Sequence, residues 1–241
     1  MEGVLPAIAI LSAACYVFGY YRRPFVFAGL LFQAGYLIIR GAALGRLPLV
    51  GPHDTLFFLS AAIVLFMLTI AHKMRGTDTV LHVTVGMAVF FMALSFLYPP
   101  HNSPLPPVLR TFWFEIHVAF SFFSYALFGI AAVFGMVSLI RGVQEHEGIQ
   151  YKMVLVGYCF FSAAMIFGGI WAYLAWGTYW LWTPKELWTV ILWLFYSYYL
   201  HARLRQWWLG RPLSVLAVTG FVIVIFTYLG VSLFMKSSHS F

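Results

Sequence analysis

Residues 113–140 read WFEIHVAFSFFSYALFGIAAVFGMVSLI, and Glu115 is the only formally charged side chain among them. A helix needs about 20 predominantly apolar residues to cross the hydrocarbon core of a bilayer. This stretch is long enough, and it lacks the short alternation of polar and apolar residues that marks a strand of a membrane barrel. It therefore predicts a transmembrane α-helix.

Similar apolar blocks recur along the whole chain, separated by short segments rich in proline, glycine and arginine. The eight blocks cover residues 4–20, 24–40, 55–72, 79–98, 113–140, 152–175, 186–204 and 212–235. The sequence predicts an all-α integral membrane protein, a bundle of about eight transmembrane helices. The first block follows Met1-Glu2 without a basic region, so we expect a retained helix rather than a signal peptide.

The composition supports the same fold class. Apolar residues make up 63% of the 241 residues and charged residues only 9%, with a mean hydropathy of +0.90. A soluble domain carries about a quarter charged residues, so too few charges are present to cover a water-facing surface. The formal net charge of +7 fits basic loops beside anionic lipid and does not indicate a nucleic-acid partner.

Lysine and arginine in the short loops predict the orientation, because cytoplasmic loops are enriched in them. With the N-terminus outside, nine fall on the cytoplasmic side: Arg22, Arg23, Lys73, Arg75, Arg141, Lys152, Arg203, Arg205 and Arg211. Five fall outside: Arg40, Arg46, Arg110, Lys185 and Lys236. This split predicts that the loop after the sixth block and the C-terminus face outward, although Arg40 and Arg46 run against it.

Tryptophan is concentrated in residues 171–193, WAYLAWGTYWLWTPKELWTVILW, which hold six of the nine tryptophans. Membrane interfaces enrich tryptophan and tyrosine at helix ends, which explains one or two of these residues. The crowding of aromatic rings in one short loop also fits a platform for a large flat ligand, because indole faces stack and indole N–H groups bond polar edges. Composition alone leaves both interpretations open.

Two histidines are expected on the same external side as this loop. His117 begins the fifth block and His239 follows the eighth. Two neutral imidazoles on opposite faces of an iron would form a bis-histidine haem site. A single interfacial histidine is more often an ordinary polar end group, and the histidines at 53, 72, 101 and 146 are expected to be solvated.

His201 differs because it lies inside an apolar block. It follows Glu186 by 15 residues, or roughly 22 Å along a helix, which places it toward the cytoplasmic end. A polar residue at membrane depth is a functional candidate, and the alternative is snorkelling into the headgroups beside Arg203. His82 has a similar predicted depth and a weaker case.

The segment WGTYWLWTPKELW at 176–188 resembles the tryptophan-rich "WWD" signature of the CcsA/ResC family of cytochrome c biogenesis System II. That pattern is close to W-G-x-Y-W-x-W-D-P-K-E-x-W, followed by an apolar helix ending in Y-L-H-x-R. The chain matches it at Trp176, Gly177, Tyr179, Trp180, Trp182, Pro184, Lys185, Glu186 and Trp188, then at Tyr199, Leu200, His201 and Arg203. The stretches HVAFSFFSYALF at 117–128 and LGVSLFMKSSHSF at 229–241 resemble the family helices that carry external histidines.

The sequence departs from this pattern at two places. Thr183 occupies the usual aspartate position, and Tyr173-Leu174 replace an Asn-Glu pair that often precedes W-G. Two acidic groups of the family are therefore missing. The resemblance divides the chain into N-terminal transmembrane helices, 1–100, and a haem-handling cytochrome c assembly core, 101–241.

The resemblance implies that the chain binds haem b, with His117 and His239 as axial ligands of an external haem. This haem would be held on the loop at residues 176–188, called the tryptophan loop from here on. It implies that His201 is a transmembrane haem ligand whose mate comes from a ResB-like subunit. Haem would be carried across the plasma (inner) membrane and attached to the C-x-x-C-H motif of an apocytochrome c, as in a cytochrome c synthase, or haem lyase. Lys185, Arg110 and Lys236 are candidate propionate partners or simple interfacial anchors.

Three other functions remain open at this point. One is haem delivery without ligation, as in the CcmC-like branch. Another is an electron-transfer cytochrome b, which would carry histidine pairs inside its transmembrane helices. The last is a regulatory or structural membrane protein, for which the tryptophan loop would have no explanation.

Overall fold

The computed structural model describes residues 3–71, 78–142 and 146–231, and their regular structure is entirely helical. The eight α-helices of this part are α1 (Val4–Phe18), α2 (Pro24–Leu44), α3 (Gly51–Ala71), α4 (Asp78–Ser95), α5 (Phe112–Arg141), α6 (Glu147–Trp176), α7 (Pro184–Ala202) and α8 (Arg211–Ile225). Two 3-10 turns, η1 (Pro107–Leu109) and η2 (Gln206–Trp208), and a π-helical segment, η3 (Phe226–Gly230), complete them.

Each α-helix overlaps one of the predicted apolar blocks, so the predicted helical membrane bundle is confirmed. Six helices are long and apolar enough to cross a bilayer: α2, α3, α4, α5, α6, and α8 together with η3. The helix α1 is apolar and shorter. The protein is therefore a multi-pass membrane protein.

Helix bounds differ from the apolar blocks where polar side chains cap or extend a helix. The helix α6 begins at Glu147, ahead of the block that starts at residue 152. The Glu147 carboxylate accepts a hydrogen bond from the Gly210 N–H at 2.6 Å and forms an ion pair with Arg203 at 3.4 Å. This polar first turn joins the beginnings of α6 and α8 to the end of α7, which hydropathy cannot reveal.

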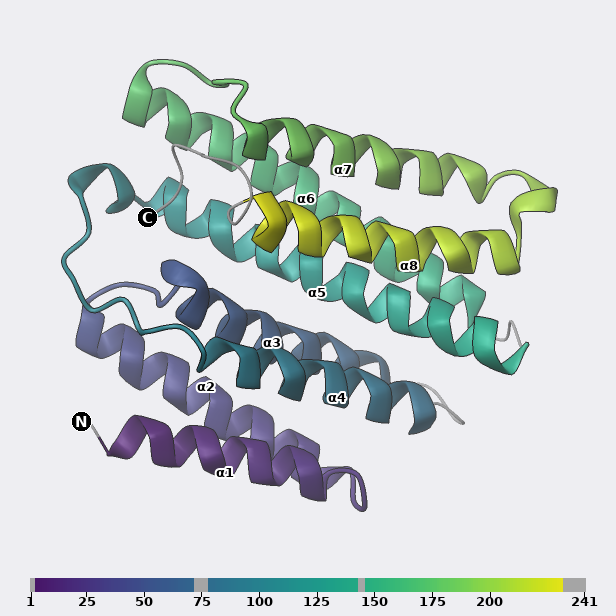
Figure 1. The fold of residues 1–241 in the computed structure, drawn as a ribbon, viewed down its shortest axis with the longest axis horizontal. Helices are drawn as coiled ribbons and strands as arrows, with labels where there is room; N and C mark the ends of the chain where they lie inside the picture. The colour runs from purple at the N-terminus through teal and green to yellow at the C-terminus, as the bar shows by residue number, and fades with distance from the viewer. Residues whose placement is uncertain (1–2, 72–77, 143–145, 232–241) are drawn as a thin grey trace. The chain divides into compact units, whose positions relative to one another are not determined.

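The chain forms two compact units, residues 1–104 and 105–241. In the first unit, α1 packs along α2 and α3 packs along α4, and α2 also contacts α3 (Figure 1). The Tyr16 hydroxyl donates to Gln33 Oε1 at 2.5 Å, and Gln33 Nε2 donates to the Phe57 carbonyl at 3.1 Å. This buried chain of hydrogen bonds joins α1, α2 and α3.

In the second unit, α5 packs against α6 and α8, and α7 lies against both α6 and α8 (Figure 1). Polar pairs fix α7 along α6. The Trp193 indole donates to Ser162 Oγ at 3.0 Å. The Tyr158 and Ser197 hydroxyl oxygens lie 2.6 Å apart. Gln150 Nε2 donates to the Tyr199 hydroxyl at 2.9 Å. These contacts set where the loop between α6 and α7 is held.

Candidate functional site

The tryptophan loop connects α6 to α7 at one end of the second unit (Figure 1). The helix α6 ends when Gly177 adopts a left-handed conformation, with φ 75°, which glycine enters without steric cost. The rings of Trp176, Tyr179 and Trp182 are exposed. Tyr179 also stacks on Tyr173 at 4.5 Å between ring centroids, so the residue at the family's asparagine position helps to shape this loop.

Trp182 has the only positive φ, 55°, among the non-glycine residues that the structure describes. This left-handed conformation is uncommon for residues with a side chain. The Glu186 carboxylate supports it from both sides, because Oε2 accepts the N–H groups of Leu181 at 3.1 Å and of Thr183 at 2.8 Å. Trp182 is 66% exposed, and Glu186 acts as a clamp on the backbone on both sides of it.

Thr183 begins α7 as its N-cap residue. Its hydroxyl accepts the Glu186 N–H at 3.3 Å, and the Glu186 side chain accepts the Thr183 N–H, which completes a capping box. Threonine and aspartate are both strong N-caps. Thr183, which stands where the family pattern has aspartate, therefore caps α7 as an aspartate could.

His117 lies near the start of α5 with its imidazole against α6. Its Nδ1 is 2.8 Å from the Ala164 carbonyl oxygen. A carbonyl only accepts hydrogen bonds, so Nδ1 carries the proton and Nε2 keeps the lone pair in the neutral ring. This is the tautomer in which Nε2 can ligate a metal.

Trp171 connects His117 to the tryptophan loop. The two rings are 6.4 Å apart and nearly parallel, with 15° between their planes. The Trp171 indole donates to the Val108 carbonyl at 2.8 Å, and its ring meets Trp176 edge-on at 4.8 Å. The structure thus brings His117 and the start of the loop together at the same end of the second unit.

Other residues of the predicted site have different surroundings. Trp188 packs edge-on against Phe226 of η3, with 4.5 Å between ring centroids. Lys185 is half-buried in the first turn of α7, and Arg110 is exposed after η1. His239 and Lys236 lie outside the described residues.

Within the part of the chain that the structure describes, the Trp180 indole nitrogen in the loop lacks a hydrogen-bond partner. The Trp180 indole N–H is buried, and it makes no hydrogen bond within the described part of the chain. A buried N–H without an acceptor costs about 1–3 kcal/mol. The Trp180 N–H is therefore a donor whose hydrogen bond is missing among the described residues.

His201 lies in the last turn of α7, at the opposite end of that helix from the loop. Its Nδ1 bonds the Ser197 carbonyl at 2.7 Å and its side chain is exposed. By the same reasoning as for His117, Nε2 keeps the lone pair. In the first unit, the His82 ring packs against Tyr20 with 4.3 Å between ring centroids and 34° between the ring planes.

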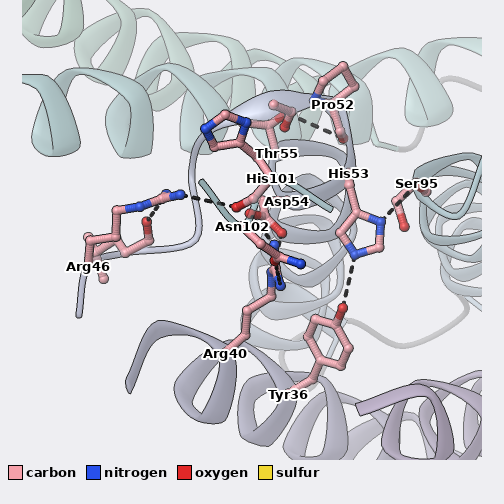
Figure 2. Close-up of polar contacts among 12 residues, drawn as sticks. Tyr36, Arg40, Arg46, Pro52, His53, Asp54, Thr55, Ser95, His101 and Asn102 are labelled. Carbon is pink, nitrogen blue, oxygen red and sulfur yellow. Dashed lines mark hydrogen bonds and ion pairs between the residues drawn. The ribbon is translucent and has the colours of Figure 1, made fainter. Parts of the chain in front are cut away.

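A second polar cluster, missed from the sequence, lies in the first unit (Figure 2). Arg40 Nε and Nη2 donate to the two carboxylate oxygens of Asp54, at 2.5 and 3.0 Å, and Nη1 donates to Asn102 Oδ1 at 3.3 Å. His53 lies between the Ser95 carbonyl, 3.0 Å from Nδ1, and the Tyr36 hydroxyl, 2.9 Å from Nε2. The ion pair and the histidine join α2, α3 and the chain after α4.

The prediction that His53 is solvated is wrong, because its side chain is buried at 4% exposure. The reason is that α3 begins at Gly51 rather than near residue 55, so His53 and Asp54 fall inside its first turn. The signal in the sequence was the spacing of Tyr36 and Arg40. Residues four apart share one helix face, which indicates a polar face on α2.

These features define a multi-pass helical membrane protein with an aromatic loop and a fixed histidine beside it. Residues 50–239 match the profile of the family described as cytochrome C assembly protein. A CcsA cytochrome c biogenesis protein from Prochlorococcus marinus subsp. pastoris is 30% identical, over 88% of this chain and 80% of its own length. The CcsA protein of Chlamydomonas reinhardtii is 30% identical over 85% of this chain and 64% of its own length.

The chain belongs to the cytochrome c assembly protein family, within its CcsA-type cytochrome c biogenesis proteins. Among solved structures, the cytochrome c heme lyase CcmF superposes with a TM-score of 0.69 at 18% identity. That match covers 93% of this chain and 45% of CcmF, so the chain spans less than half of that protein. At this identity the likeness shows a shared fold.

Proposed function

We propose that this chain holds haem b on the tryptophan loop, between the imidazoles of His117 and His239, and presents it for attachment to an apocytochrome c. The observation that carries the proposal is the position of His117. Its Nδ1–H is bound to the Ala164 carbonyl at 2.8 Å, which keeps the Nε2 lone pair for iron, and Trp171 links its ring to the loop.

The surrounding residues fit haem as the substrate. The exposed rings of Trp176, Tyr179 and Trp182 offer apolar faces for a flat macrocycle. The buried Trp180 N–H, which has no acceptor among the described residues, suits a propionate oxygen. Lys185 and Arg110 from the described part, and Lys236 beyond it, would add charge-assisted bonds to the propionates.

In this function, His117 and His239 hold the iron while the vinyl edge of the macrocycle stays open to the client. Each cysteine thiol of the C-x-x-C-H motif adds its sulfur and hydrogen across a vinyl double bond, forming a thioether. The histidine of that motif displaces one of the two protein imidazoles, which releases the product. The chain would act as the CcsA/ResC-like subunit of a cytochrome c synthase.

We further propose that His201 receives haem at membrane depth and that a ResB-like subunit supplies the opposite ligand. Support comes from the exposure of the His201 side chain and its bond to the Ser197 carbonyl, which leaves Nε2 as the ligating nitrogen. Exposed histidine is costly in lipid. A haem shared with a neighbouring helix would remove that cost.

This function requires the tryptophan loop and the C-terminus on the extracytoplasmic side of the plasma (inner) membrane. In the count of loop charges, Arg40 is one of the basic residues that fall on the external side. Its guanidinium is buried and paired with Asp54, so it no longer counts as a free loop charge under the positive-inside rule. The remaining basic residues favour the proposed orientation more clearly.

The test is maturation of a reporter apocytochrome with one C-x-x-C-H motif, in cells that lack their own maturation system. The chain is expressed with a ResB-like subunit, and covalent haem on the reporter is measured. We expect holocytochrome from the wild type and none from His117→Gly. Haem bound to the membrane protein without any holocytochrome would contradict ligation and favour delivery alone, a function that Thr183 and Tyr173-Leu174 in place of acidic residues would suit.

A further inference from the structure

Two adjacent glycines in α6, Gly168 and Gly169, have different neighbours. A Cβ atom built at Gly168 would lie 2.6 Å from His117 Nδ1 and 2.7 Å from its Cε1. Among the described residues, a Cβ at Gly169 would meet the Tyr179 carbonyl oxygen alone, at an ordinary 3.6 Å. The His117 ring therefore occupies the space that a side chain at 168 would need, and the neighbouring position has room to spare.

We propose that Gly168 and the Ala164 carbonyl form a seat for the His117 imidazole, and that Gly168 is a positioning residue for the iron ligand. The proposal rests on the proposed role of His117 as a haem ligand. The seat does two things: the carbonyl fixes the tautomer, and the missing side chain at 168 lets the ring approach the helix closely enough to reach that carbonyl.

The seat is one face of a single helix. Ala164, Gly168 and Trp171 follow the i, i+4, i+7 spacing of residues that line one side of an α-helix. Ala164 is 1% exposed and Trp171 is 4% exposed, and Trp171 is tied to the Val108 carbonyl at 2.8 Å. The ring of His117 is thus bounded by the helix backbone and by the Trp171 indole.

A ligating histidine is commonly oriented by a hydrogen bond from its second ring nitrogen to a carbonyl or carboxylate. Loss of such a partner typically lowers metal affinity about 10–100-fold. A methyl group at 168 would displace the ring and break the Nδ1–Ala164 bond. The Nε2 atom would then lose both its fixed tautomer and its direction toward the iron.

The experiment compares Gly168→Ala with Gly169→Ala in the full chain with its ResB-like partner. Both changes add one methyl group to the same helix and raise its intrinsic helix propensity by the same amount. We expect Gly168→Ala to lose the six-coordinate bis-histidine absorption spectrum and to weaken external haem binding about 10–100-fold. Added imidazole should restore the spectrum, and Gly169→Ala should match the wild type.

The His117→Gly variant separates failure of the seat from failure of the proposed function. If His117→Gly changes the spectrum and Gly168→Ala does not, the seat is wrong and the proposed function stands. If His117→Gly itself changes nothing, the proposed function fails. Equal effects of both alanine variants would overturn the seat, since they would reflect a stiffer helix.

Should Gly168→Ala reduce the amount of folded protein, the variant carrying both His117→Gly and Gly168→Ala decides the matter. Removing the imidazole removes the clash, so the double variant should recover the folded yield of His117→Gly alone. Failure to recover would mean that the added methyl group clashes with something other than His117, which overturns the proposal.

Discussion

Thr183 and Glu186 hold each other at the start of α7. The Glu186 N–H donates to the Thr183 hydroxyl at 3.3 Å, and the Thr183 N–H donates to Glu186 Oε2 at 2.8 Å. The position where the family carries aspartate is therefore an N-cap in this chain. A missing carboxylate does not remove the cap, so the loop keeps its attachment to the helix.

The first prediction follows from this cap. Thr183→Asp should leave thermal stability and haem content unchanged, because aspartate caps a helix as well as threonine. Thr183→Ala removes the acceptor for the Glu186 N–H and should lower stability by about 1 kcal/mol. Thermal unfolding in detergent, with haem content measured by absorbance, checks both. A loss of stability in the aspartate variant as large as that in the alanine variant would contradict the capping role.

Glu186 gives a second prediction, because its carboxylate also accepts the Leu181 N–H at 3.1 Å. Glu186→Ala should release both backbone groups that flank Trp182 and free it from its left-handed conformation. We expect weaker haem binding than in Thr183→Ala, which breaks the cap and retains the bond to Leu181. Haem titration of the two variants makes the comparison. Equal affinities would show that Trp182 does not depend on the Glu186 clamp.

The buried pair of Arg40 and Asp54 provides a third prediction. Arg40→Met leaves the Asp54 carboxylate buried without its counter-ion, which costs about 3–5 kcal/mol. Replacing both residues, Arg40→Met with Asp54→Leu, should recover much of that loss. Thermal unfolding of the three proteins measures the effect.

The chain contains a matched control for this test. Arg23 and Asp78 form an ion pair on the surface of the same unit, with side chains 47% and 64% exposed. Arg23→Met should change stability little, because water and salt screen exposed pairs. If the two methionine variants are equally stable, the buried pair does not hold the first unit together.

The fold was readable from the sequence because the bilayer imposes a length on each apolar block. Contacts between residues on different helices could not be predicted from the sequence. Tyr36 and His53 are 17 positions apart, and their hydrogen bond depends on how α2 packs on α3. The role of Trp188 also depends on packing, since its neighbour Phe226 lies in η3. The sequence does predict which residues share one face of a helix, as the four-residue spacing of Tyr36 and Arg40 shows.

The candidate site shows the same division. The motif at 176–188 indicated the loop, and the stretch at 117–128 indicated His117. The seat on α6 depends on the positions of two helices relative to each other. Gly168 has no distinguishing feature in the sequence beside Gly169. The two glycines differ in the structure, because a Cβ atom added at Gly168 would clash with His117 and one added at Gly169 would not.

A fourth prediction concerns His201 and its partner. The isolated chain should bind haem at the external site only, and co-purification with a ResB-like subunit should add a second haem. His201→Gly should remove that second haem and leave the first. His82→Gly, which alters a histidine packed on Tyr20, serves as the control. Two haems at full occupancy on the isolated chain would contradict the need for a partner.

Absorption spectroscopy tests directly whether His117 and His239 bind one haem iron from opposite faces. The absorption spectrum of haem on the purified protein is recorded for the wild type, His117→Gly and His239→Gly, each with and without added imidazole. We expect a bis-histidine spectrum in the wild type, five-coordinate and easily oxidised haem in both variants, and partial recovery with imidazole. Spectra that remain unchanged in both single variants would show that His117 and His239 do not ligate the iron.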